Sequence, residues 1–216
     1  MKQLIIPFFL LPATVAGQSI MSHGAIEIPF ASAGHVIELT IENASSIPQS
    51  SITVNAAALP AWLTLEPREY ALGALPGRTG KTALFMFAVE KAAPVNTDHT
   101  LTFTVNGSSG QTWSKGVTIR IAPPASFELF QNYPNPFNPT TSIAYQLPLE
   151  SRVRLVIYDL LGKEVSTLVD GHRSAGYHQV EWDASDASSG LYVCHIMATG
   201  HDGRETVRNR MMMLVR

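Results

Sequence analysis

The stretch GRTGKT at residues 77–82 contains the residue types of a phosphate-binding loop. Such a loop surrounds phosphates with backbone amides next to glycines and reaches them with a lysine. The motif requires a glycine five positions before Gly80, where this chain has Leu75. It also requires a following helix, whereas residues 83–89 have the pattern of a strand. We therefore predict no nucleotide site and no other cofactor.

Metal-binding and catalytic patterns do not emerge from the remaining polar residues. His172 and His178 lie six positions apart, without a cysteine or carboxylate at ligand spacing. Asp183 and Asp186 lack the acidic ladder and the bidentate glutamate of a calcium loop. We find no serine nucleophile elbow and no carboxylate pair. The sequence predicts no metal site and no catalytic residue, and we expect a protein that is not an enzyme.

Cys194 is the single cysteine of the chain, so it has no partner for an internal disulfide. In a strand it shares one face with Tyr192 and Ile196, which favours a buried, inert thiol over a nucleophile. The protein must therefore owe its stability to its hydrophobic core alone.

Length and charge narrow the classes of protein further. A chain of 216 residues accommodates one large or two small domains. Charged residues make up 15%, and 15 Gly and 14 Pro favour many turns over long solvated helices. A formal net charge of -2 argues against a nucleic-acid partner, which requires a basic surface.

The N-terminus has the organisation of a secretory signal peptide. Lys2 precedes an apolar run at residues 4–11, and small residues at 15–17 offer a cleavage site before Gln18. The run is shorter than the roughly 20 residues of a membrane span. We therefore predict a signal peptide over residues 1–17 and no transmembrane segment in the mature chain. The alternative is that this segment forms a buried first strand.

Residues 18–122 have a period-two pattern typical of a β-sandwich. Ile37, Leu39 and Ile41 alternate with polar residues, which predicts a half-buried strand. Residues 84–89 are apolar at both parities, as expected for a central strand. Turn signals separate these short runs, and no helical period lies between them. The pattern indicates an immunoglobulin-like β-sandwich.

Trp62 stands in the stretch LPAWLTL at residues 59–65, which resembles bacterial immunoglobulin-like modules of secreted proteins. We expect this side chain to lie in the core or at its rim. The alternative is an exposed ring that stacks on a sugar, which makes Trp62 a possible ligand contact.

Prolines mark the boundary to a second domain. Pro123 and Pro124 stiffen a linker at residues 123–126 and interrupt strand hydrogen bonding. Alternating strands and glycine turns then continue over residues 127–216. The predicted fold class is all-β, with two small immunoglobulin-like β-sandwich domains in tandem.

Motifs of this second domain occur in a characteristic order. YPNPFNPTT stands at residues 133–141, IYD at 157–159 and SGLY at 189–192, and the chain ends in a basic residue. Together they resemble the type A C-terminal sorting domain of type IX secretion cargo. Small immunoglobulin-like domains of flagellar hook-capping proteins are also similar in fold and partly in sequence.

The proline-rich motif also has a direct physical interpretation. Pro134, Pro136 and Pro139 restrict their own φ and hold each preceding residue in an extended conformation. The motif is therefore a stiff, extended brace, and we expect Tyr133 and Phe137 to anchor it to the sheet. Glycines at 162, 176 and 190 follow turns, where a positive φ is often required.

The resemblance implies a route of export. An outer-membrane translocon of the type IX secretion system reads the folded C-terminal domain. A surface protease removes the domain, and the cargo is anchored to a surface glycolipid or released. The positions expected to carry the sorting signal are Tyr133, Pro134, Asn135, Pro136, Gly162, Gly176, Gly190, Tyr192 and Arg216.

These observations favour a non-enzymatic protein that is secreted, or held on the outer-membrane surface of a Gram-negative bacterium, after passing through the periplasm. Its N-terminal domain would be a structural or binding module. One alternative is a small extracellular carbohydrate-binding or adhesion protein. Another is a hook-cap-like assembly protein, which fits poorly with a cleavable signal peptide.

Overall fold

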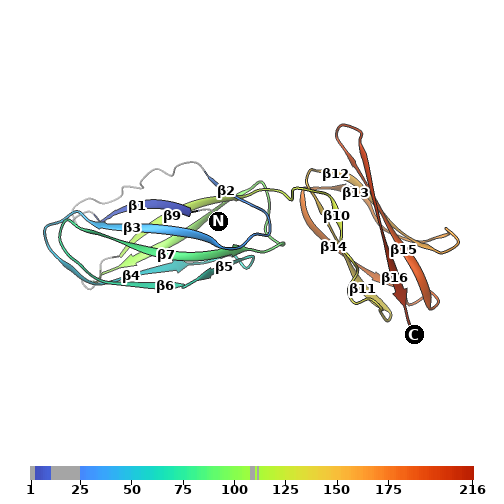
Figure 1. Cartoon of the computed structure of the whole chain (residues 1–216), viewed down its shortest axis with the longest axis horizontal. Helices are drawn as coiled ribbons and strands as arrows, with labels where there is room; N and C mark the ends of the chain where they lie inside the picture. Colours follow the sequence, from blue (N-terminus) through green and yellow to red (C-terminus); the bar gives the residue numbers. More distant parts are fainter. Residues whose placement is uncertain (1–2, 11–24, 108–109, 111) are drawn as a thin grey trace. The chain divides into compact units, whose positions relative to one another are not determined.

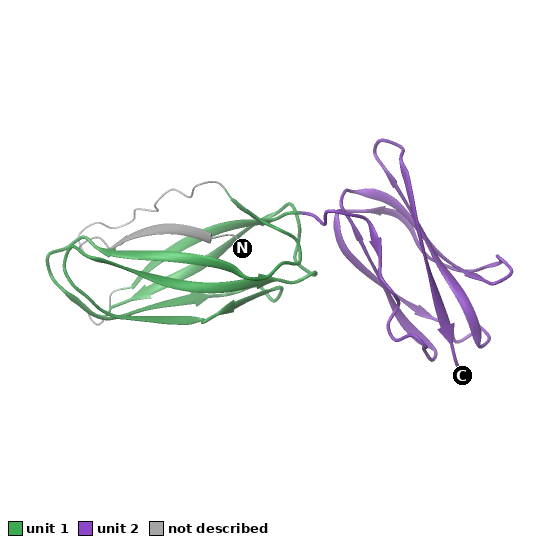
Figure 2. Ribbon diagram, in the orientation of Figure 1, with its two compact units in different colours: residues 1–122 green, residues 123–216 purple. Residues whose placement is uncertain are grey.

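The computed structural model describes residues 3–10, 25–107, 110 and 112–216, and every regular element in these ranges is a β-strand (Figure 1). The chain divides into two compact units, Met1–Ala122 and Pro123–Arg216 (Figure 2). Within these ranges no helix is long and apolar enough to cross a membrane. The predicted fold class, two small immunoglobulin-like sandwiches in an all-β chain, is confirmed.

Unit 1 is built from a four-stranded and a five-stranded sheet that share one hydrophobic core. Their orders are β1-β3-β7-β5 and β2-β9-β8-β4-β6. The strands are β1 (Gln3–Leu10), β2 (Ile26–Ile28), β3 (His35–Asn43), β4 (Gln49–Ala57), β5 (Leu63–Glu66), β6 (Glu69–Leu75), β7 (Gly80–Val89), β8 (Asp98–Asn106) and β9 (Thr112–Ile121).

The core of unit 1 follows from the period-two pattern. In β3 the residues at one parity, among them Ile37, Leu39 and Ile41, are buried, and those at the other parity are half-buried. Phe85 of β7 and Phe103 of β8 are both fully buried, with ring centroids 5.0 Å apart. Since they come from different sheets, this pair joins the two layers. The half-buried strand predicted around Ile37, Leu39 and Ile41 is confirmed.

Strand β7 carries apolar residues on both faces, but only one face is buried. Its residues at one parity are buried, but Leu84 and Met86 at the other parity are 42% and 61% exposed. β7 lies between β3 and β5 in its sheet, as the sequence predicted for a central strand, but only one of its two apolar faces is covered. The apolar side chains on the outer face lack a second layer, because unit 1 closes with two sheets.

The segment with the features of a signal peptide forms strand β1 over Gln3–Leu10. It pairs in parallel with β3, from Gln3 opposite Val36 to Leu10 opposite Asn43. This is the strand arrangement considered as the alternative for this segment. The expected cleavage site before Gln18 lies outside the described residues, so the signal peptide stays a prediction.

Unit 2 also contains two sheets around one core. The smaller has the order β10-β11-β14, and the larger has the order β13-β12-β15-β16. Residues 122–127, which precede the first of these strands, form no strand. The strands are β10 (Glu128–Leu129), β11 (Thr140–Leu147), β12 (Ser151–Asp159), β13 (Glu164–Arg173), β14 (Gly176–Asp183), β15 (Gly190–Gly200) and β16 (Glu205–Leu214).

Replacing Phe85 by alanine tests the assignment of the two faces of β7. Loss of the buried ring is expected to lower the free energy of unfolding by about 3–5 kcal/mol, because a cavity forms between the sheets. Leu84→Ala is the matched control on the outer face, with an expected change of about 0.5 kcal/mol or less. Chemical denaturation followed by tryptophan fluorescence measures both. Equal losses would contradict the assignment.

Candidate functional site

The proline-rich segment at residues 131–139, here called the strap, joins the two sheets of unit 2. Tyr133 exchanges backbone hydrogen bonds with Ser142 of β11, each with an N to O distance of 2.9 Å. Phe137 pairs with the last strand, since its amide donates to Met213 O at 2.9 Å and its carbonyl accepts from Val215 N at 3.0 Å. The strap therefore fastens the start of the domain to the end of the chain.

Side chains of the strap strengthen this contact with β16. The amide of Met213 donates to Oδ1 of Asn135 at 2.9 Å, across 78 positions of sequence. Gln131 Nε2 donates to the carbonyl of Met211 at 2.8 Å. Strand β16 lies at the edge of its sheet, so these contacts satisfy backbone groups that an edge strand would otherwise leave open.

A buried polar pair determines the path of the strap. Asn132 and Thr141 are both almost fully buried. Asn132 Nδ2 donates to Thr141 Oγ1 at 2.9 Å and to Pro134 O at 3.0 Å, and Thr141 Oγ1 donates to the same carbonyl at 2.8 Å. Burying these groups is tolerated because they are hydrogen-bonded. Sequence reasoning missed both residues, because nothing local marks a polar residue as buried.

An aromatic cluster lies under the strap. The Phe137 ring is 5.3 Å from Trp182, and Trp182 is 5.2 Å from Tyr192, between centroids. Tyr192 is buried and donates its hydroxyl to Ser188 O at 2.6 Å. Phe137 is thus the anchor that the sequence predicted. Tyr133 is not, because it is 82% exposed and only its backbone is bonded.

The end of the chain is held by the loop between β14 and β15. Arg216 Nη2 donates to Ala184 O at 3.3 Å and also to Ser185 O. Asp183 shapes this loop by accepting from the backbone amide and the hydroxyl of Ser185. The Ser185 hydroxyl is the main reason that the pKa of Asp183 is lowered.

Most of the predicted signal residues gather at this end of unit 2. Gly190 pairs with Leu214, and Tyr192 pairs with Asp159 just before the turn that contains Gly162. Tyr133, Pro134, Asn135, Pro136 and Arg216 belong to the strap and the terminus described above. Gly176 lies apart, at the other end of β14, where it faces Leu147.

At two of these glycines, Gly162 and Gly176, a positive φ favours glycine over residues with a side chain. Gly162 has φ 81° in the turn after β12, and an added Cβ would meet nothing within 4 Å. Gly176 has φ 122° and is buried at the start of β14. Side chains are disfavoured at such φ values, so these residues serve the fold.

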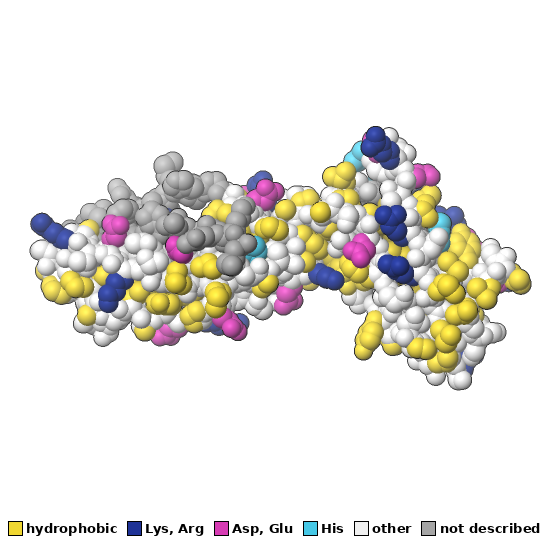
Figure 3. Space-filling view, viewed as in Figure 1, with side chains coloured by type: hydrophobic (Ala, Val, Ile, Leu, Met, Phe, Trp, Pro, Cys, Tyr) yellow, Lys and Arg dark blue, Asp and Glu magenta, His cyan; other side chains and the backbone are white. Residues whose placement is uncertain are grey.

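Exposed apolar side chains lie around the same end of the unit. Met211, Met213 and Val215 point outward from the last strand and its end, and Leu160 and Leu161 stand in the neighbouring turn. Figure 3 shows hydrophobic side chains gathered on the surface near the C-terminus. This end of unit 2 therefore combines an exposed polar strap with an apolar surface.

The residues considered for phosphate or metal binding contact other groups of the protein. Lys81 Nζ donates to the carbonyl of Leu72 at 2.9 Å, and Lys81 lies in strand β7, where a phosphate loop would require a helix. His172 lies 4.0 Å from a carboxylate oxygen of Glu150. In the described part of the chain no group of three or more His, Cys, Asp or Glu side chains could hold a metal ion.

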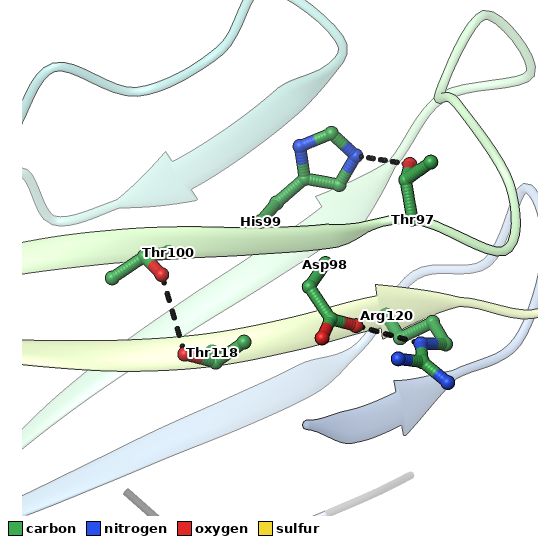
Figure 4. A network of polar contacts seen from close by, with 6 residues as sticks. All are labelled: Thr97, Asp98, His99, Thr100, Thr118 and Arg120. Atoms are coloured by element: carbon green, nitrogen blue, oxygen red, sulfur yellow. Dashed lines mark hydrogen bonds and ion pairs between the residues drawn. The ribbon is translucent and has the colours of Figure 1, made fainter. Parts of the chain in front are cut away.

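Trp62 is half-buried at the rim of the unit 1 core, with its ring centroid 4.8 Å from that of His99. Figure 4 shows His99 on the opposite side of β8 from Asp98, which is bonded to Arg120 at 2.6 Å. The hydrogen bond from Arg120 lowers the pKa of Asp98. The position of Trp62 agrees with a structural role at the rim, and its contact with a ligand stays a prediction.

With the geometry known, comparison with other proteins places unit 2 in a class. Its two strapped sheets form an immunoglobulin-like β-sandwich at the end of the chain. Residues 131–207 match the family described as secretion system C-terminal sorting domain. The resemblance to type IX sorting domains is thereby confirmed, and unit 2 belongs to that family. The chain accordingly carries a signal for secretion to the cell surface or the extracellular space.

Solved structures show weaker similarity. Latent PorU from Porphyromonas gingivalis is 15% identical, with 92% of this chain and 19% of that chain covered and a TM-score of 0.34. The CupB2 chaperone of Pseudomonas aeruginosa is 11% identical, with 87% and 97% covered and a TM-score of 0.29. Similarity at this level does not bear on function. No curated protein matches the chain.

Asn135→Ala tests whether the strap secures the last strand. The substitution removes the acceptor of the Met213 amide, so we expect a loss of about 1 kcal/mol in stability and faster hydrogen exchange at that amide. Asn138→Ala, in the same motif and also exposed, is the control. Native-state exchange followed by NMR reports both. Unchanged protection of Met213 in Asn135→Ala would contradict this role.

Cys194 provides a test that depends on pH. The thiol is buried, and burial raises its pKa from 9.0 to about 12. A raised pKa keeps the thiol protonated in the folded chain while it ionises in the unfolded chain, so its contribution to stability is present below pH 9 and is lost as the pH rises towards 12. A thiol reagent at pH 8 should label the unfolded chain and leave the native chain unlabelled. Rapid native labelling would contradict the buried position.

Proposed function

We propose that this chain is a non-enzymatic protein exported in two steps. Its signal peptide directs it across the inner membrane, and the type IX translocon in the outer membrane then recognises unit 2. The observation that carries the proposal is the match of residues 131–207 to the sorting-domain family. Unit 1 then acts outside the cell as a structural or binding module.

The exposure of the signal residues divides them into two groups. A translocon can contact Tyr133, Pro134, Asn135 and Pro136 directly, because they are exposed on the strap. Gly162, Gly190 and Arg216 are exposed as well. Tyr192 and Gly176 are buried, so they act by holding the domain in its folded shape.

Further partners belong to the same proposal. A surface protease removes unit 2 after export, and unit 1 is then released or joined to a surface glycolipid. Two potentially reactive side chains have structural positions, which supports a non-enzymatic role. The Cys194 thiol is buried, and the Lys81 ammonium donates to a backbone carbonyl.

Mass spectrometry of the protein termini, from the surface and medium fractions of the native organism, tests the route. We expect an N-terminus at Gln18 and no peptides from residues 127–216, because both signals are removed. A chain truncated after Ala122 should remain in the periplasm. Detection of the intact chain to Arg216 in the periplasm alone would contradict the proposal.

A point variant separates recognition from folding in the same assay. Tyr133→Ser alters an exposed side chain without an aromatic contact to the core cluster, so the domain should fold while its export falls. Leu149→Ser is the control, since Leu149 is also exposed and lies outside the strap. Equal export of both variants would exclude direct recognition of Tyr133.

A further inference from the structure

The outer face of the five-stranded sheet in unit 1 carries small, uncharged side chains on three neighbouring strands. On β4, β8 and β9 one parity points into the core, and the other points outward. The outward residues of β8 between its charged first residue and its end are three threonines and one asparagine. We call the following set the neutral face: Thr53, Asn55, Ala57, Thr100, Thr102, Thr104, Asn106, Thr112, Ser114, Gly116 and Thr118.

Strand register arranges the neutral face in rows across the sheet. One row contains Asn55, Thr104 and Ser114, which are direct partners on β4, β8 and β9. The rows on either side are Thr53, Asn106, Thr112 and Ala57, Thr102, Gly116. Strand geometry separates neighbours by about 4.8 Å within a row and by about 6.7 Å along a strand. The face is thus a regular array.

Short side chains keep this array even and rigid. Gly116 leaves room for the methyl group of Thr100, since a Cβ at position 116 would come within 2.9 Å of it. Thr100 and Thr118 share a hydroxyl hydrogen bond of 3.2 Å, which Figure 4 shows, and Thr112 donates to Asn106 Oδ1 at 3.1 Å. β-Branched side chains lose little freedom on binding, because χ1 is already restricted.

Charges surround the neutral face without entering it. At one end Asp98 and Arg120 neutralise each other at 2.6 Å, and Glu69 stands on the edge strand β6. The outer face of the opposite sheet is different, because it carries the carboxylates of Glu38 and Glu42 on β3. The two faces of one domain therefore differ in chemistry, although both are exposed to solvent.

We propose that the neutral face binds the uncharged, hydroxyl-covered surface of an extended polysaccharide. Threonine, serine and asparagine side chains both donate and accept hydrogen bonds, as sugar hydroxyls do. No charge on the face has to be stripped of water when such a ligand approaches. Each contact is weak, but a repeating face on a repeating polymer adds them together.

The charge of the face decides between neutral and anionic polymers. An anionic polysaccharide or a nucleic acid requires cations on the contact surface, and the neutral face contains none. This proposal names the class of ligand that unit 1 binds as the binding module of the proposed function. It rests on the proposed function only for the export of unit 1 from the cell. A binding test on the purified chain does not involve export, so the binding proposal and the export proposal can fail separately.

Binding to suspended microcrystalline cellulose and to chitin tests the proposal, with alginate beads as the anionic comparison. The purified chain should be depleted from solution by at least one of the two neutral polymers and not by alginate. Thr118→Lys should weaken the apparent affinity by about tenfold, because an ammonium would be desolvated against a neutral surface.

Thr82→Lys is the matched control. Thr82 also shares a cross-strand hydroxyl contact, with Thr40 at 3.1 Å, but it lies on the opposite sheet. The affinity of the Thr82→Lys variant for the neutral polymer should stay within about twofold of that of the unsubstituted chain. A twofold change corresponds to a few tenths of a kcal/mol in binding free energy. Unfolding midpoints verify that both variants fold, and Thr104→Lys replaces Thr118→Lys if that variant does not.

Three results would overturn the proposal. The first is no depletion by either neutral polymer. The second is equal weakening by the substitutions on the two sheets, which would indicate an effect of charge or stability rather than of the face. The third is depletion by alginate alone, which would assign the binding to cationic residues elsewhere on the chain.

Discussion

The pairing of the strap with the last strand is the contact on which unit 2 depends. Phe137 exchanges backbone hydrogen bonds with Met213 and Val215, and Asn135 adds a side-chain bond to the same strand. Without it, β16 would be an edge strand whose backbone pairs with β15 on one side and is open on the other. Because the strap also pairs with β11, one short segment joins both sheets and places the end of the chain beside the start of the domain.

This arrangement gives a physical reason for a folded domain to serve as a secretion signal. The exposed strap, the turn at Gly162 and the terminal Arg216 come from distant parts of the sequence, and they are neighbours only after both sheets have formed. In the proposed function, a translocon that contacts these groups together therefore detects completed folding. The buried partners Trp182 and Tyr192 contribute by supporting the strap from below.

In unit 1 the two outer faces of one sandwich differ in chemistry. Both sheets supply alternate residues to a single core, with Phe85 and Phe103 in contact across it. Their outer residues are free of that constraint, and one sheet carries carboxylates while the other carries hydroxyls and amides. Packing thus accounts for the inner residues, and the proposed ligand class accounts for the contrast between the outer ones.

The sequence by itself determined the strands, their inward parity and the glycine turns, because alternation and backbone φ are local properties. Ile37, Leu39 and Ile41 revealed their face in this way, and the ordered motifs of residues 131–207 revealed the family. Only the tertiary structure decided which faces are covered. It exposed Tyr133 and Leu84 and buried Asn132 with Thr141, since burial depends on partners far away in the sequence, which no local pattern specifies.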